Sequence, residues 1–388
     1  KEVVNKYIEE KVGITPEQEN AARRSVLPNK FISVVEGFAG AGKSYTMSVV
    51  TKSYKEKKYD TIGITLSWKA ANVLKSETNM NCMSMASFLT ARNNRSGNDS
   101  ISHDSLIVVD EAGLIGLSQM TEFLTICKSS RHHVKVILSG DSTQLNPIGD
   151  CNSLEIIKNI IPKEAHAVIS EIRRQNSISH RSAVLFLKDG KSGEALYIYQ
   201  QQEMLKFMNS QSDLIGEVLK DYFTALKHKP NDSMLVIAMD NKLVRELSVR
   251  IREILIKIGK VDMSTAITLQ IPNDSAKSSN NEPKYITQDF AVGDVIHFKK
   301  NDKNIKLKDK ITNREYDAET FLTNKTNGRI SGISGSKENG YEIMVDIEVP
   351  GKGPNGTEAL AYVKINTKLY TDNSNKILVP IDLNYAIT

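Results

Sequence analysis

The residues from Gly37 to Ser44 have the types and spacing of a loop that holds phosphate groups. Gly37 is followed by four residues and then by Gly42, Lys43 and Ser44. Small residues let several backbone N–H groups converge on one anion without a Cβ in the way. In such a loop, Lys43 reaches the β- and γ-phosphates and Ser44 offers a hydroxyl to Mg²⁺. The residues expected to bind nucleotide are therefore Gly37, Gly40, Ala41, Gly42, Lys43 and Ser44; the alternative is a glycine-rich turn that binds nothing.

Two carboxylates, Asp110 and Glu111, follow the hydrophobic run LIVV. A parallel sheet places its ligands at this end of its strands. We expect Asp110 to hold Mg²⁺ and Glu111 to orient or deprotonate the water that attacks the γ-phosphate. By itself, an acidic pair at a strand end is often only a charge at a helix N-terminus. The phosphate loop favours the hydrolytic interpretation.

A second polar group follows the run VKVILSG, where Gln144 stands just past an expected strand. A glutamine there can touch both the γ-phosphate and the segment that moves when this phosphate leaves. Lys43, Asp110, Glu111 and Gln144 together predict hydrolysis of a nucleoside triphosphate.

The elements that must position these residues alternate between strands and helices. FISVVE, before the loop, is β-branched and apolar, and Tyr45 to Tyr54 lacks Gly and Pro and can form a helix. From Phe31 to about Leu145, further apolar runs alternate with helical stretches. This alternation predicts an α/β nucleotide-binding domain with a parallel sheet.

The second half of the chain has a different pattern of apolar and turn-forming residues. A helix stripe recurs at Leu243, Leu247, Ile251 and Leu255, after the strand-like run SMLVIAM, and indicates a second α/β domain. The polar stretch 271–284 reads as a loop or boundary. Beyond it, short strands separated by Gly and Asn predict a small inserted β-barrel, which either grips nucleic acid or is decoration.

Composition sets broad limits on the protein class. The 388 residues carry a net charge of +5, which permits a nucleic-acid partner without requiring one. The three cysteines are far apart and suggest neither a zinc site nor disulfides. No apolar run approaches the roughly 20 residues of a membrane span, and the charged N-terminus does not resemble a signal peptide. We expect a cytoplasmic protein and, since Lys1 is not Met, a piece of a longer one.

Taken together, these motifs resemble superfamily 1B DNA helicases of the RecD-like branch, most closely the helicase segment of TraA/TraI-type conjugative relaxases. The resemblance covers nearly the whole chain. It implies an ATP- and Mg²⁺-dependent motor that moves 5′ to 3′ on single-stranded DNA, separates duplex at junctions, and works with other conjugation proteins.

The resemblance also assigns further residues. Gln18 in ITPEQENA stands where the family reads adenine, and Arg174 in SEIRRQ stands where an arginine meets the γ-phosphate. Arg252, in NKLVRELSVRIR, matches an arginine of the second RecA-like domain, and the resemblance implies that it contacts the nucleotide. The segment TLSWKAANVL is similar to a DNA-contacting motif, whose expected contacts here are Thr65, Ser67, Trp68 and Lys69. Trp68, the only tryptophan, either stacks on a base or packs in the core.

The implied architecture is two RecA-like P-loop domains, the second truncated, with an inserted SH3-like β-barrel. The expected boundaries are 1–175 for the first domain, 176–284 for the first part of the second, 285–380 for the barrel and 381–388 for the return. The chain departs from the family at its end, because relatives continue past Thr388 into a His-Lys-Ser-Gln-Gly motif and a second arginine motif. We therefore expect this piece to hydrolyse nucleotide weakly.

Two other functions compete with the motor. A helicase-fold module that has lost hydrolysis and only holds single-stranded DNA is one, although such a copy should have lost at least one of Lys43, Asp110, Glu111 and Gln144. A small-molecule or nucleoside kinase is the other. The kinase hypothesis does not explain Gln144, Arg174 and the expected barrel together.

Overall fold

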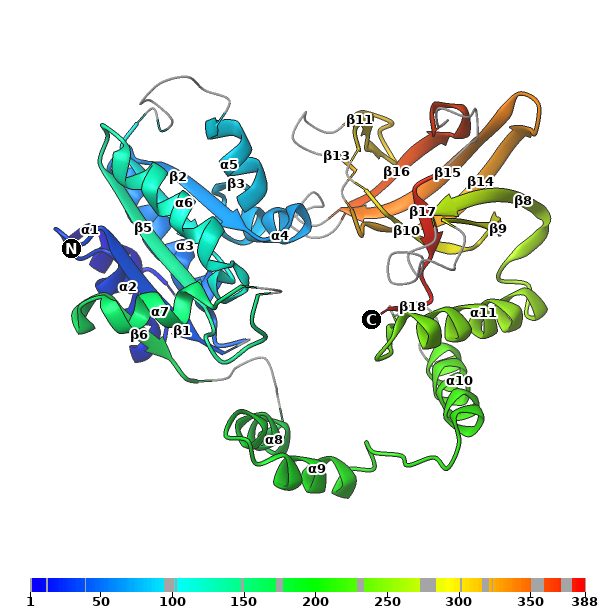
Figure 1. Cartoon of the computed structure of the whole chain (residues 1–388), viewed down its shortest axis with the longest axis horizontal. Coiled ribbons are helices and arrows are strands. Elements are labelled where there is room, and N and C mark those ends of the chain that lie inside the picture. Colours follow the sequence, from blue (N-terminus) through cyan, green and yellow to red (C-terminus); the bar gives the residue numbers. More distant parts are fainter. Residues whose placement is uncertain are drawn as a thin grey trace. The chain divides into compact units, whose positions relative to one another are not determined.

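The structure is a computed structural model that describes residues 2–11, 13–38, 40–93, 101, 103–147, 150–171, 177–228, 234–272, 284–300, 302–315, 321–322, 324–349, 359–370 and 379–387. Its contacts divide the chain into two compact units, Lys1–Lys206 and Phe207–Thr388. Figure 1 shows the helices and strands of each unit. None of the helices in the described ranges combines the length and the apolar character that crossing a membrane requires.

The first unit is built on a six-stranded sheet in the order β3-β2-β4-β5-β1-β6. Every strand pair in it is parallel, as the alternating sequence pattern predicted. The strands are β1 (Ile32–Gly37), β2 (Asp60–Thr65), β3 (Asn81–Ser84), β4 (Ser105–Val109), β5 (Val134–Gly140) and β6 (His166–Ile169). All their carboxyl ends therefore meet at one edge of the sheet.

Helices cover both faces of this sheet. Successive strand residues point to opposite faces, so neighbouring residues of β1 pack against different helices. Val34 belongs to one hydrophobic cluster, with residues of α5 (Met85–Asn93), α6 (Leu117–Ser129) and α7 (Ser153–Ile160). Its neighbour Val35 belongs to the other, with residues of α1 (Glu2–Glu9), α2 (Pro16–Ser25), α3 (Lys43–Glu56) and α4 (Trp68–Thr78). The expected helix after the phosphate loop is α3. Two further helices, α8 (Ile178–Lys188) and α9 (Ser192–Gln201), complete the unit.

The second unit begins with α10 (Gln211–His228), β7 (Val236–Ile237) and α11 (Asn241–Lys257). The stripe expected from the sequence is confirmed, since Leu247, Ile251 and Leu255 of α11 are buried. At the far end of the chain, β18 (Ala386–Ile387) pairs in parallel with β7, with Ala386 opposite Val236. The segment between α11 and β18 is thus an excursion from this small parallel pair.

That excursion is antiparallel. A long pair, β8 (Asp262–Pro272) and β9 (Tyr285–Val292), precedes a six-stranded sheet in the order β12-β16-β15-β14-β10-β17. The strands of this sheet are β10 (Val295–Phe298), β12 (Lys308–Asp309), β14 (Asn327–Ser336), β15 (Gly340–Val349), β16 (Ala359–Asn366) and β17 (Ile381–Leu383), and a separate pair consists of β11 (Asp302–Lys306) and β13 (Phe321–Leu322).

The expected closed barrel is not confirmed, because this sheet has two ends in the described residues, β12 and β17. These edge strands have two and three residues, whereas β14 and β15 have ten each. Edges this short offer few backbone groups for closing the sheet. One hydrophobic cluster still joins α11 to the sheet, so the excursion and the helix share a core.

Candidate nucleotide site

The phosphate loop leaves β1 at Gly37 and enters α3 at Lys43. Gly40 and Gly42 have left-handed backbone conformations, with φ of 83° and 82°. A side chain at Gly42 would also collide with the amide of Gln18. Glycine is therefore needed at position 42 for both backbone conformation and space.

Lys43 is buried, and its Nζ donates to the carbonyl oxygens of Gly37 at 2.7 Å and of Phe38 at 3.4 Å. Both acceptors belong to the loop itself. The ammonium is thus held against the phosphate loop by neutral groups, which keep its positive charge available to an anion.

The acids lie directly after β4. Asp110 accepts a hydrogen bond from Ser139 Oγ of β5 at 2.9 Å, and its own N–H donates to Ile64 O at 2.8 Å. Glu111 has φ 50° and ψ 43°, a left-handed conformation that is uncommon for a residue with a side chain. Strain of this kind clusters at functional sites, where the surrounding structure enforces it. Its position beside Asp110 supports the role expected of Glu111.

Two glycines bring the loops after β4 and β5 into contact. A Cβ on Gly113 would lie 2.9 Å from Asp141 O, and one on Gly140 would lie 3.1 Å from Ala112 N. Asp141 then organises the second loop: it accepts from Thr143 N at 3.0 Å and from Gln144 Nε2 at 3.4 Å. The close approach therefore places Gln144 near the acids.

A cavity of about 670 Å³ collects seven of the residues predicted to bind or hydrolyse nucleotide. This volume is within the usual range for small-molecule sites. The predicted residues that line it are Gly40, Gly42, Lys43, Ser44, Asp110, Glu111 and Gln144. Gly37 and Ala41 belong to the same loop but do not line the cavity, and Arg174 lies outside the described residues.

The same cavity has lining residues that the sequence did not reveal: Lys11, Phe38, Tyr45, Ser48 and Glu77. Lys11 Nζ lies 4.1 Å from the centre of the Tyr45 ring and donates to Ser48 Oγ at 3.0 Å. Burial, with a smaller effect of Lys52, lowers the pKa of Lys11. Tyr45 could have been found from its place directly after Ser44. Lys11 carries no motif, because its approach to α3 depends on how α1 packs.

Gln18 lies beneath the loop rather than in the cavity. It is buried, its Oε1 accepts from Thr15 N at 3.1 Å, and its Nε2 donates to Ala41 O at 3.0 Å. With Thr15 it forms a capping box at the start of α2. Its expected contact with adenine stays a prediction, and the contacts present connect α2 to the phosphate loop.

Glu17, beside Gln18, anchors the residues that precede the Arg174 segment. Its carboxylate accepts from Ser170 N at 2.7 Å, Ser170 Oγ at 2.6 Å and Glu171 N at 3.1 Å. The hydrogen bond from the Ser170 hydroxyl is the largest cause of the lowered pKa of Glu17. Sequence reasoning missed this contact, because it joins residues more than 150 positions apart.

The residues expected to contact DNA meet where β2 passes into α4. Thr65 is buried and donates to Ser67 O at 2.7 Å, while Ser67 caps α4 by accepting from Ala70 N at 3.2 Å. Trp68 is half-buried, packs beside the cluster of α3 and α4, and donates from Nε1 to Ser87 Oγ at 2.9 Å. Lys69 is exposed. Trp68 thus has core contacts, and its stacking on a base stays a prediction.

Arg252 belongs to the second unit and is fully engaged there. Its Nε and Nη2 donate to Oδ1 and Oδ2 of Asp294 at 2.8 and 2.9 Å. Asp294 has no exposed surface and also accepts from Tyr385 Oη at 2.7 Å and Ala291 N at 2.8 Å. These contacts favour a structural role that holds α11 to the turn before β10. The nucleotide contact expected of Arg252 stays a prediction.

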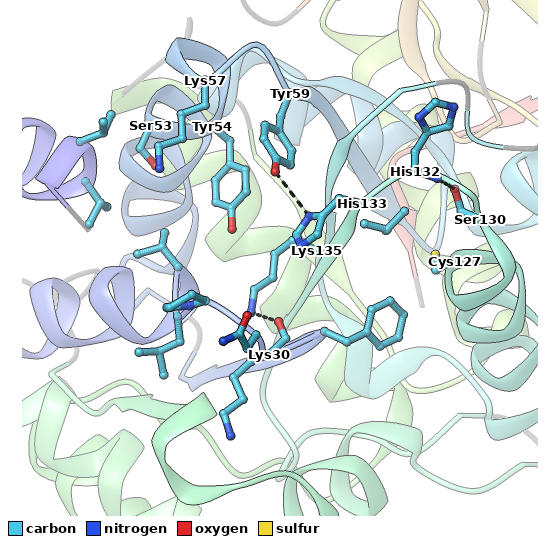
Figure 2. A pocket seen from close by; sticks show the side chains of 18 of the residues that line it. Lys30, Ser53, Tyr54, Lys57, Tyr59, Cys127, Ser130, His132, His133 and Lys135 are labelled. Carbon is cyan, nitrogen blue, oxygen red and sulfur yellow. Dashed lines mark hydrogen bonds between the residues drawn. The ribbon is translucent and has the colours of Figure 1, made fainter.

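A larger cavity, of about 740 Å³, lies at the other edge of the first sheet, where the strands begin. Figure 2 shows Tyr54, Tyr59, His133 and Lys135 around it. Lys135 is buried and donates from Nζ to Lys30 O at 2.8 Å and Ser33 Oγ at 2.7 Å. None of the predicted site residues is among its lining residues. Size therefore does not identify the site here; the motifs do.

A family model described as an AAA domain matches residues 13–210, just over half of the 388 residues. The chain belongs to this AAA domain family. The match covers the phosphate loop, both acids and Gln144, so the AAA domain contains the whole cavity apart from Lys11.

Curated relatives match more of the chain than the AAA domain model does. The conjugal transfer protein TraA of Agrobacterium fabrum (strain C58) is 25% identical over 334 residues, which are 86% of this chain and 28% of that protein. A probable conjugal transfer protein TraA of Sinorhizobium fredii is 25% identical over 346 residues, 89% of this chain and 29% of that protein. The chain thus spans less than a third of the length of these relatives.

Solved structures show the fold. The Pif1 helicase from Candida albicans matches with a TM-score of 0.51 and 13% identity, over 97% of this chain and 85% of that one. Bacteroides Pif1 bound to single-stranded DNA matches with a TM-score of 0.51 and 14% identity, over 97% and 83%. The family, the relatives and the fold confirm the resemblance to the helicase segment of TraA/TraI-type proteins.

Proposed function

We propose that the chain is an ATP-hydrolysing helicase segment of a conjugative transfer protein, coupling hydrolysis to 5′-to-3′ movement on single-stranded DNA. The observation that carries this proposal is the single cavity shared by the phosphate loop, Asp110, Glu111 and Gln144. A phosphate loop alone supports only nucleotide binding. A water-activating acid and a γ-phosphate sensor in the same cavity support hydrolysis.

Each residue has a role in this proposal. Backbone N–H groups of the loop and Lys43 hold the β- and γ-phosphates, and Glu111 accepts a proton from the attacking water or orients that water. Gln144 contacts the γ-phosphate and loses that contact after hydrolysis. Arg174 is proposed to add positive charge at the same phosphate.

The donors fit Mg²⁺. The described residues contain no cluster of three or more His, Cys, Asp or Glu that could hold a metal. Mg²⁺ does not need one, because it binds through one or two protein oxygens, waters and the phosphates of the substrate. Ser44 and Asp110 both line the cavity and would hold it, and the ion would neutralise charge on the phosphates.

The DNA path is proposed from the β2–α4 junction, where Lys69 is exposed and Trp68 half-buried. The relatives are transfer proteins by name, and a Pif1 structure of the same fold holds single-stranded DNA. We further propose that the parallel pair β7–β18, with α10 and α11, is part of a second RecA-like domain. The antiparallel sheet would then be an SH3-like insertion with open edges.

The test is ATP hydrolysis by the chain with and without single-stranded DNA, compared with Glu111→Gln. We expect DNA to stimulate hydrolysis and Glu111→Gln to lower kcat at least about 100-fold, with ADP affinity retained. Displacement of streptavidin from 3′- or 5′-biotinylated strands measures direction. Single-strand binding without hydrolysis, and with no response to ATP analogues, would instead support the binding-only module.

A further inference from the structure

Glu36 is a half-buried carboxylate that none of the motifs includes. It lies in β1 directly before Gly37, opposite Gly140 of β5 on one side and Val168 of β6 on the other. Its side chain is 14% exposed. A carboxylate so far from water needs hydrogen bonds and cationic partners to remain ionised.

Three side chains provide these partners. Oε1 accepts from Ser142 Oγ and from Lys158 Nζ at 3.3 Å, and Oε2 contacts His166 Nε2 at 3.2 Å. Lys158 also donates to Ser142 Oγ at 2.7 Å and pairs with Glu155 at 2.7 Å. Burial raises the pKa of Glu36, but the Ser142 hydrogen bond and the charges of Lys158 and His166 outweigh it, so the pKa is lowered.

The network joins the two halves of the nucleotide site. On one side, Glu36 is bonded to Gly37, whose carbonyl oxygen holds Lys43 at 2.7 Å. On the other side, Ser142 follows Asp141, which accepts from Gln144 Nε2 at 3.4 Å. One carboxylate therefore fixes the loop of Gln144 relative to the loop that grips the phosphates.

We propose that Glu36 is a positioning residue that keeps the Gln144 loop aligned with the phosphate loop, so that the hydrolysis step depends on Glu36 while nucleotide binding does not. This inference rests on the proposed function. It follows from the geometry because the network touches the backbone on both sides of the cavity, yet Glu36 itself is not among the residues that line it.

The experiment compares Glu36→Gln with Glu155→Gln. Both substitutions remove one carboxylate partner of Lys158, and Glu155 also interacts with the Ser142 side chain. Glu36 differs in that it accepts from both the hydroxyl and the backbone N–H of Ser142 and contacts His166. For Glu36→Gln we expect kcat for ATP hydrolysis to fall roughly 10-fold or more, as small misplacements of reacting groups do. ADP affinity should stay within about two-fold in both variants, and Glu155→Gln should keep the kcat of the unmodified chain.

Ser142→Ala tests the contact from the other side. It removes the hydroxyl donor but keeps the backbone N–H of residue 142, which donates to Glu36 Oε1 at 3.4 Å, so kcat should fall less than in Glu36→Gln. The double variant should be no slower than Glu36→Gln, because both substitutions act on one connection. Equal kcat in Glu36→Gln and the unmodified chain would overturn the proposal. A kcat loss in Glu155→Gln as large as in Glu36→Gln would overturn it too, by assigning the effect to Lys158 alone.

Hydrogen exchange separates this inference from the proposed function. If Glu36 holds the loop, backbone amides in 141–147 should exchange faster in Glu36→Gln than in Glu155→Gln, without any nucleotide. A chain that hydrolyses no ATP would refute the proposed function, and the exchange rates would still decide whether Glu36 positions the loop. Unchanged exchange in both variants would refute the positioning role.

Discussion

Lys43 in the phosphate loop and Arg252 in α11 are both buried cations, 7% and 9% exposed, but their partners differ. Arg252 meets the carboxylate of Asp294 through two hydrogen bonds, and two further donors complete that carboxylate. Among the described residues, the hydrogen-bond partners of Lys43 Nζ are carbonyl oxygens of its own loop. Arg252 is neutralised within the protein, whereas Lys43 keeps a charge that a phosphate group can neutralise.

A third buried cation, Lys135, has neutral partners like Lys43 but lies outside the phosphate loop. Its partners are a carbonyl and a hydroxyl, and burial lowers its pKa to about 8. It lines the cavity at the amino ends of the strands, away from the helix N-terminus and glycines that make a phosphate loop. A buried cation thus indicates function only where the surrounding backbone can also bind the anion.

We expect the largest effect from substituting Arg252, and we expect it on stability. Arg252→Met leaves Asp294 buried with no cation, which should lower the free energy of unfolding by about 3–5 kcal/mol. The loss should appear in circular dichroism of the whole chain under urea. Fluorescence of Trp68, the only tryptophan, reports the first unit and should keep its midpoint. Weaker ATP binding with unchanged unfolding would instead favour the nucleotide contact first expected of Arg252.

Lys43→Ala should affect ATP hydrolysis rather than stability, in contrast to Arg252→Met. Removing the ammonium should lower ATP hydrolysis about 100- to 1000-fold, because a preorganised charge at the phosphates is lost. Stability should change little, since the partners of Lys43 in the described part of the chain are neutral carbonyls of its loop. Steady-state kinetics and urea unfolding of the same preparation check both halves. If Lys43→Ala lowered the free energy of unfolding but left ATP hydrolysis unchanged, the proposed difference between Lys43 and Arg252 would be wrong.

Lys135 should give the smallest effect, visible as a pH dependence. Its pKa falls from 10.5 to about 8 on folding, so between these values the unfolded chain binds more protons. The free energy of unfolding should therefore rise with pH across this window, by on the order of 2 kcal/mol. Lys135→Met should lack this rise. Urea unfolding at pH 7.5 and 9.5 measures it, and parallel pH responses in both proteins would contradict the assignment.

Much of the first unit could be predicted because its signals are local. The phosphate loop needs particular residues within one turn, and the acids and Gln144 each follow a buried strand. Once the strands are parallel, their ends must share an edge. The second unit was harder. Strands were expected there, but as short ones in a closed barrel, whereas β14 and β15 have ten residues each and the sheet is open in the described residues. Closure depends on how edge strands pair, which no local pattern encodes.

The amino-acid sequence by itself determined which residues are candidates for the chemistry: a glycine-rich phosphate loop, an acid pair and a glutamine after a strand, within an alternation that predicts a parallel sheet. Only the tertiary structure decided which polar groups have hydrogen-bond partners within the protein itself. It commits Arg252 to Asp294 and Gln18 to Thr15 and Ala41, and it joins Glu36 to Ser142. Contacts such as Glu36 with Ser142 depend on strand order and on which helix covers which face. They are long-range properties of packing, whereas motifs are short-range properties of the backbone.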